Sequence, residues 1–138
     1  MKLYPRLRRA GGGQSGAAAV EFALVAGLLL LLVFGIIEFG RVFSELGVFN
    51  AAARAGARAA AVRAETSDVQ DAIVSAAGPY DVDFTNFQMT TESAGSQCDE
   101  ATQGELITVG WDQSFEINIL LLPEVTKSVN IQGVFRCE

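Results

Sequence analysis

The longest apolar stretch of the chain lies close to its N-terminus. From Phe22 to Ile37 no side chain is polar, and together with Ala17–Val20 the run reaches about the 20 residues that a helix needs to cross a bilayer core. A soluble helix that is apolar on every side must be surrounded by protein, and a chain of 138 residues offers too little core for that. The pattern therefore predicts a transmembrane helix over residues 17–37.

A helical pattern continues beyond this run. Apolar residues recur at spacings of three and four, and the Ala- and Arg-rich stretch that follows has high helix propensity. We predict one helix from about residue 17 to about residue 64, with residues 38–64 as a stem outside the membrane. The apolar stripe of this stem comprises Phe39, Val42, Phe43, Leu46, Phe49, Ala53, Ala57 and Ala60.

Two local features of the stem have structural consequences. Arg41 lies at helix spacing from Glu38 and Glu45 and can pair with either. The small residues from Ala51 to Ala61 let another backbone approach closely, which suits contact with neighbouring subunits or with the protein's own sheet. An ordinary amphipathic stem that covers a small domain explains the same residues equally well.

The remainder of the chain predicts a short helix and then strands. Residues 66–78 have a helical pattern, with Thr66 or Ser67 as the N-cap and Gly78-Pro79 at the end. Alternating apolar and polar residues predict three strands within residues 80–90, 105–117 and 128–136. The apolar residues 117–123 are predicted to form a loop that docks on the stem. The fold class is therefore α+β, with residues 65–138 as one small domain containing an antiparallel sheet.

Charge is distributed unevenly along the chain, whose net charge is −6. Four basic residues and no acid occur among the first nine residues, whereas only Lys127 and Arg136 are basic after Glu65. Positive charge before a membrane helix predicts a cytoplasmic N-terminus, which places residues 65–138 outside. An acidic outer domain is unsuited to binding nucleic acid, because phosphates need Lys and Arg partners.

The sequence contains little that could carry catalysis. It has no His, and no phosphate loop, nucleophile elbow or zinc-ligand spacing. Asp81 and Asp83 share one face of a predicted strand, where a solvated surface is a far commoner explanation than a cation site. We expect no enzyme activity, no cofactor and no metal. Cys98 and Cys137 are predicted to form a disulfide outside the cytoplasm, the alternative being two unpaired thiols.

Glu21 stands at the start of the apolar run, where a charge costs free energy. The basic segment before it allows three interpretations, which are a cleaved signal peptide, an unprocessed anchor and a prepilin-type leader. A signal peptide is disfavoured because the run is too long and no small-residue cleavage site follows it. In an unprocessed membrane anchor, Glu21 would have this free-energy cost and no evident function. A cut between Gly16 and Ala17 would create an α-amino group for which Glu21 is a counter-charge, especially on a neighbouring helix. A position of Glu21 in the headgroup region, where a negative charge suits the helix dipole, explains the residue equally well.

Three segments resemble the TadE-like pseudopilins, which are minor subunits of the tight-adherence (Flp) pilus system. These segments are GAAAVEFALV (16–25), FGIIEFGRVF (34–43) and NAAARAGAR (50–58). Ala55 departs from the Glu that the family commonly has at this position. The resemblance implies a pilin-like fold and the following residues: Gly16 and Ala17 at the cut, Glu21 and Phe22 in the processing and assembly motif, and Glu38, Phe39, Gly40, Arg41, Arg54, Gly56 and Arg58 in helix packing.

The same resemblance implies proteolytic processing, a location and a set of partners. Residues 1–16 form a leader that a prepilin peptidase removes, and the helix remains in the cytoplasmic membrane or enters a surface pilus. The expected partners are that peptidase, the major Flp pilin and a second minor pilin, with no nucleic acid. The rival functions are an unprocessed single-pass protein whose outer domain binds a ligand, and a pseudopilin of a type II secretion machine.

Overall fold

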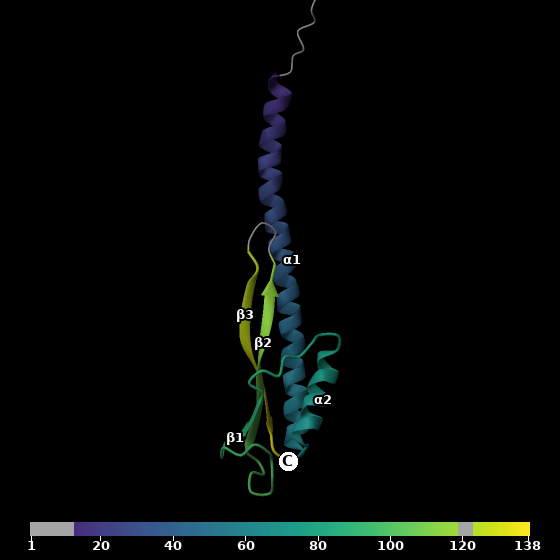
Figure 1. Cartoon of the computed structure of the whole chain (residues 1–138), viewed down its shortest axis with the longest axis vertical. Coiled ribbons are helices and arrows are strands. Elements are labelled where there is room, and N and C mark those ends of the chain that lie inside the picture. The colour runs from purple at the N-terminus through teal and green to yellow at the C-terminus, as the bar shows by residue number, and fades with distance from the viewer. Residues whose placement is uncertain (1–12, 119–122) are drawn as a thin grey trace, which may run out of the picture.

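The protein consists of two helices followed by a three-stranded antiparallel sheet, which is the predicted α+β class (Figure 1). The computed structural model describes residues 13–118 and 123–138. Most of the predicted leader and of the predicted docking loop lie outside these ranges. The elements are α1 (Gly13–Ala61), α2 (Thr66–Ala77), β1 (Gln88–Thr91), β2 (Leu106–Ile117) and β3 (Val125–Arg136).

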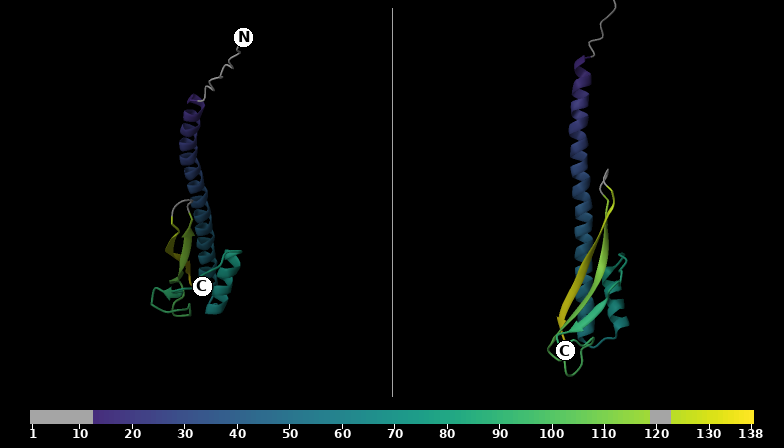
Figure 2. Two further views of the ribbon diagram at one scale, coloured as in Figure 1. Left: turned by 45° about the horizontal axis from the view of Figure 1, so that its top comes forward. Right: turned by 60° about the vertical axis from the view of Figure 1, so that its left-hand side comes forward.

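Helix α1 is continuous over 49 residues, or about 70 Å at the usual rise per residue. Its first half projects away from the rest of the protein, and its second half packs against the sheet and α2 (Figures 1 and 2). The helix ends at Ala61, three residues earlier than predicted. Arg63 has a φ of 65°, in the left-handed region, and a helix cannot continue through such a residue.

Helix α2 lies antiparallel to the end of α1 and buries Val69, Ile73 and Ala77. These residues recur every fourth position, which places them on one face. The predicted side-chain cap at Thr66 or Ser67 is wrong. Glu65 occupies the N-cap with extended backbone and makes no side-chain capping hydrogen bond.

The sheet has the order β1-β2-β3, and both strand pairs are antiparallel. The first predicted strand is largely wrong, because only Gln88–Thr91 pair with β2. The side chain of Asp83 accepts a hydrogen bond from the Thr85 amide at 3.0 Å, and Asn86 has a φ of 55°. These local turns interrupt an extended strand, so Asp81 and Asp83 do not share a strand face. The third strand begins at Val125, three residues before the predicted start.

The core lies between the sheet and the second half of α1. Trp111, Phe49, Ile107 and Ile131 are among its fully buried side chains, and the indole N–H of Trp111 donates to Oε1 of Gln113 at 3.2 Å. Within the predicted stripe of the stem, Phe49 and the alanines are buried, whereas Phe39 and Phe43 are exposed. Val42 and Leu46 are partly buried against the core, so the stripe contacts the protein from Val42 onward, except at Phe43.

Small residues bring the backbones of α1 and the sheet into direct contact. A Cβ on Gly133 of β3 would overlap the carbonyl of Ala53 in α1. A Cβ on Gly56 would lie 2.5 Å from Cγ1 of Ile73 in α2. On the buried side of α1, the small residues of the stem therefore allow close packing against the protein's own sheet and second helix.

Candidate functional site on the long helix

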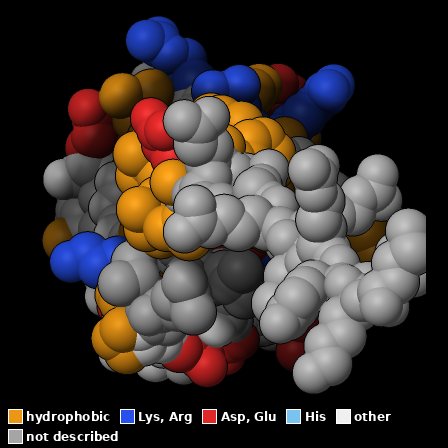
Figure 3. Space-filling model, turned by 90° about the horizontal axis from the view of Figure 1, so that it is seen from above, with side chains coloured by type: hydrophobic (Ala, Val, Ile, Leu, Met, Phe, Trp, Pro, Cys, Tyr) orange, Lys and Arg blue, Asp and Glu red, His pale blue; other side chains and the backbone are white. Residues whose placement is uncertain are grey.

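The first half of α1 is apolar and uncovered. Within Gly16–Ala61 an 18-residue window has a mean hydropathy of 2.7, and none of that window is buried. Within the described residues this is the one helix long and apolar enough to cross a membrane. Seen from above, hydrophobic side chains gather mostly near the middle of the view and charged side chains lie mostly towards its edge (Figure 3). Such a surface needs lipid or other helices around it.

The residues of the predicted cleavage motif all lie on this uncovered helix. Gly16, Ala17 and Glu21 are exposed, and Phe22 is 74% exposed. A Cβ on Gly16 would meet no atom within 4 Å. Ala17 and Glu21 are four residues apart and therefore lie on the same side of the helix. Within the described chain Glu21 has no side-chain hydrogen bond or ion pair, so any partner must come from elsewhere.

A charged cluster joins α1 to the sheet directly after the apolar segment. Nη2 of Arg41 lies 2.7 Å from Oε1 of Glu38, and Nη1 of Arg41 lies 3.2 Å from Oε2 of Glu45. Arg41 also donates to the carbonyl of Glu116 at 2.6 Å, and the amide of Asn118 donates to Oε1 of Glu38 at 3.0 Å. The connected ends of β2 and β3 are thereby held at the level where the apolar segment ends. We call these five residues the junction.

The electrostatics of the junction follow from its hydrogen bonds. The Arg41 guanidinium and then the Asn118 amide lower the pKa of Glu38 to about 2. The same contact with Glu38 raises the pKa of Arg41. Both groups therefore stay charged at any physiological pH. The sequence predicted that Arg41 pairs with Glu38 or Glu45, and the structure contains both pairs.

One face of the stem is exposed along its whole length and points away from the sheet. Its residues follow one another at spacings of three and four. The residues near the apolar segment are small or apolar, and the two residues near the C-terminal end of α1 are arginines. We call it the outer face of α1; it comprises Ile36, Gly40, Phe43, Gly47, Ala51, Arg54 and Arg58. Gly56, which the sequence grouped with Arg54 and Arg58, instead packs against α2.

The outer face has no partner among the described residues. Phe43 is 68% exposed, and a Cβ on Gly40 or Gly47 would meet nothing within 4 Å. Arg54 and Arg58 form a basic ridge at the far end of this face, and they make no ion pair with any described residue. Small residues beside an exposed Phe allow another helix to approach closely.

The C-terminus lies beside the end of α1 (Figure 1), and a disulfide joins Cys137 near it to Cys98. Both cysteines are buried, and their Cα atoms are 5.6 Å apart. The amide of Glu138 donates to the carbonyl of Ala61 at 3.1 Å. The disulfide therefore ties the long loop after β1 to the chain end, and the hydrogen bond of Glu138 ties the chain end to the last turn of α1.

Comparison with known proteins gives one match, and it falls on this helix. No curated protein and no solved structure matches the chain. A family model described as TadE-like protein matches residues 16–58, which begin at the predicted cut and end at Arg58. Over residues 16–58, which make up nearly all of α1, the chain is therefore similar to the TadE-like family.

Proposed function

We propose that the protein is a minor pilin or pseudopilin that acts in assembly of a tight-adherence (Flp) pilus. One observation carries this proposal, which is that the TadE-like segment coincides with a helix that is apolar, exposed and unpartnered over its first half. An isolated membrane anchor needs only the apolarity. A subunit of an assembly also needs exposed side chains that can contact neighbouring subunits. Glu21 and the outer face of α1 are such groups.

Cleavage between Gly16 and Ala17 falls in the second turn of α1. Gly13 and Gly16 both lie before the cut, and each glycine weakens a helix by about 1 kcal/mol relative to Ala. This end of the helix therefore opens more easily than the apolar run that follows. A prepilin peptidase needs an extended backbone at the scissile bond, and the two glycines provide it at low cost.

The cut gives Glu21 a new electrostatic role. The freed amine of Ala17 is positively charged at neutral pH and stands at a helix N-terminus, where the helix dipole disfavours positive charge. Glu21 lies one turn further along, where the dipole favours a carboxylate. In a low-dielectric environment, pairing between the amine of one subunit and Glu21 of a neighbour sets their relative height along the helix axis.

The outer face extends the same contact beyond the membrane. When the α1 helices of two subunits pack together through their apolar segments, their contact can extend along Gly40, Phe43 and Gly47. The sheet and α2 do not obstruct it, because they cover other sides of α1. The charged ridge of Arg54 and Arg58 follows at the far end and awaits acidic groups. The proposed orientation has the basic leader in the cytoplasm and the disulfide-bonded domain outside.

Pilus assembly in cells tests this function. We expect deletion of the gene to abolish or reduce surface pili, and the wild-type gene to restore them, as counted by electron microscopy of sheared filaments. Glu21→Ala should enter the membrane in normal amounts but fail to restore pili, because it lacks the counter-charge. Glu65→Ala removes an exposed carboxylate outside the apolar segment that makes no side-chain capping hydrogen bond, so it is the matched control and should restore them.

Two outcomes would contradict the proposal. Cells without the gene that still assemble normal numbers of pili would show that the protein serves another role, such as an unprocessed anchor for a binding domain. Full restoration by Glu21→Ala would refute the proposed pairing of Glu21 with a neighbour's amine, while the similarity to the TadE-like family would remain.

A further inference from the structure

The face of the sheet that points away from α1 is lined by neutral polar side chains in cross-strand rows. Register places Gln88, Gly110 and Gln132 in one row across the three strands. The next row consists of Thr90, Thr108 and Val134. Neighbouring side chains on one sheet face contact each other, so these rows form a continuous surface.

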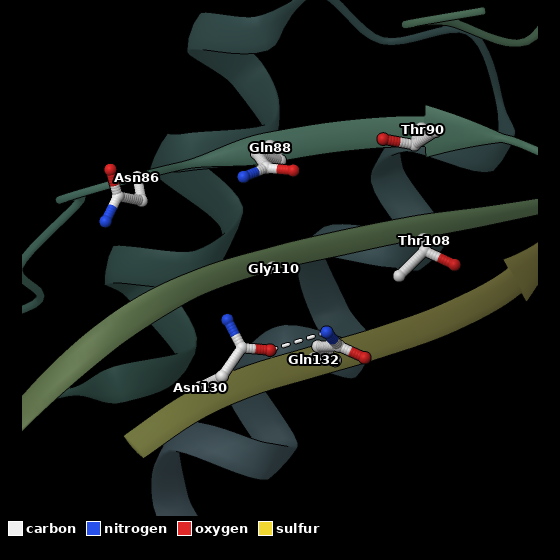
Figure 4. Close-up of a pocket in the computed structure, with 7 residues that line it drawn as sticks. All are labelled: Asn86, Gln88, Thr90, Thr108, Gly110, Asn130 and Gln132. Atoms are coloured by element: carbon white, nitrogen blue, oxygen red, sulfur yellow. Dashed lines mark hydrogen bonds between the residues drawn. The ribbon is translucent and has the colours of Figure 1, made fainter. Parts of the chain in front are cut away.

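The absent side chain of Gly110 creates a hollow of about 210 Å³ in this surface (Figure 4). A Cβ at this position would lie 3.1 Å from Cγ of Gln132 and 3.1 Å from the Ile131 carbonyl. The hollow therefore depends on glycine. Its lining contains only amides, hydroxyls and this glycine, contributed by Asn86, Gln88, Thr90, Thr108, Gly110, Asn130 and Gln132.

Hydrogen bonds fix the orientation of the amides at one side of the hollow. Asn86 and Asn130 each donate to a different oxygen of Asp112 at 2.9 Å. Gln132 in turn donates to Oδ1 of Asn130 at 2.5 Å, as the dashed line in Figure 4 marks. The carbonyl oxygen of Gln132 is left to accept a hydrogen bond from outside. Amides that are already oriented lose less entropy when a ligand binds.

A second hollow adjoins the first and is partly aliphatic. It has a volume of about 330 Å³ and shares Thr90 and Thr108 with the first. Leu106 and Val134 line it and are 38% and 49% exposed. The sheet face therefore offers neutral hydrogen-bonding groups at one end, and at the other it offers exposed C–H surface beside the carboxylate of Glu92.

We infer that these two adjoining hollows bind a neutral saccharide. Sugar hydroxyls both donate and accept, as do the amides and threonine hydroxyls, and the C–H face of a pyranose ring suits Leu106 and Val134. The first hollow has no charged lining group, and the carboxylates of Glu92 in the second hollow and of nearby Asp112 disfavour anions. Because the hollows are shallow and contain no aromatic ring, the dissociation constant is expected to be on the order of millimolar.

This binding does not depend on the proposed role in a pilus, and its test uses the isolated protein. The full chain is placed in nanodiscs of lipids without sugar headgroups, because glycoside detergents would compete. Saturation-transfer NMR is then recorded with maltotriose, lactose and diacetylchitobiose, and with digalacturonic acid as a charged comparison. We expect transfer to at least one neutral sugar and none to the acidic one.

Variants of exposed residues distinguish the hollow from the rest of the surface. Gln88→Ala combined with Gln132→Ala should weaken binding about tenfold or more, since two hydrogen-bonding amides are lost. Gly110→Ala fills the hollow and should weaken sugar binding as well. Ser114→Ala lies on β2, is exposed and lines neither hollow, so it is the control and should bind normally.

Three results would overturn the inference. The first is the absence of transfer to every neutral sugar at tens of millimolar, which would identify the face as a solvated sheet surface. The second is unchanged binding by the Gln88 and Gln132 double variant when its NMR spectrum is otherwise native. The third is equal transfer to the acidic sugar, which would refute the selection for neutral ligands.

Discussion

Individual residues explain both the packing of this protein and its proposed assembly. Gly133 has no side chain because the carbonyl of Ala53 occupies the space where a Cβ would be. Gly16 and Glu21, in contrast, have empty space around them, so nothing within the described chain accounts for their identity. Residues that packing does not explain are candidates for function.

Gly133→Ala should destabilise the protein by about 1–3 kcal/mol, the usual cost of overpacking a close contact. Gly47→Ala is the matched control, because a Cβ there meets nothing and alanine favours the helix by up to about 1 kcal/mol. Denaturant unfolding of the detergent-solubilised chain, followed by the fluorescence of Trp111, measures both. Equal stabilities of the two variants would contradict the close approach of β3 and α1.

At the scale of elements, the sequence predicted both helices and the two long strands well. Their signals are local, since periodicity and propensity act within each segment. The strand predicted at residues 80–90 was largely wrong, because only its last residues belong to β1. An alternation of apolar and polar residues indicates that every second side chain is buried, and it does not require that the backbone pairs as a strand. Val82 and Phe84 are partly buried and pack on the core, with the Phe84 ring 6.2 Å from that of Trp111, although the backbone there is not a strand.

The candidate site was predictable to the extent that it is contained in one helix. The predicted cleavage motif and the pairing of Arg41 with its neighbours are visible as spacings along the sequence. The contacts of the junction with Glu116 and Asn118 span 75 and 80 residues, and no local pattern encodes them. The hollow at Gly110 likewise requires the register of three strands, which the sequence did not provide.

The junction should resist acid. The pKa of Glu38 is lowered from 4.5 to about 2 by its hydrogen bonds from Arg41 and Asn118. A carboxyl whose pKa is lowered on folding stabilises the fold fully above its unfolded pKa, and this contribution is lost as the pH falls towards the folded value. The Asn118 amide shift in an NMR titration should therefore change with a midpoint near pH 2.

Glu38→Gln is the control for this titration. Its Asn118 amide should lack the acidic transition, because no carboxylate remains to titrate there. A midpoint near pH 4.5 in the wild-type protein would show that the hydrogen bonds of the junction do not persist in solution.

The whole molecule combines an exposed helix with a small domain held on its far half. The domain is closed at one end by the junction and at the other by the disulfide, whose cysteines are 39 residues apart. A small domain of this kind buries limited apolar surface and benefits from a covalent link. The two ties leave the outer face of α1 and the polar face of the sheet as the free surfaces.

Reduction of the disulfide should lower the free energy of unfolding by about 3–4 kcal/mol, the loop-closure value for a loop of this length. The Cys98→Ser, Cys137→Ser double variant should behave in the same way. Circular dichroism during thermal unfolding, with and without reductant, measures the loss. The double variant should show no further change when reductant is added, and an unchanged melting temperature on reduction of the wild type would contradict this role.

The mass of the mature protein tests the central claim most directly. The full chain is produced in cells with and without a prepilin peptidase, purified from membranes and measured intact. With the peptidase we expect loss of residues 1–16 and a chain that begins at Ala17. Gly16→Leu should stay uncut, whereas Gly27→Leu, which also has open space around it, should be cut normally. A wild-type protein that still begins at Met1 in the presence of the peptidase would contradict the account.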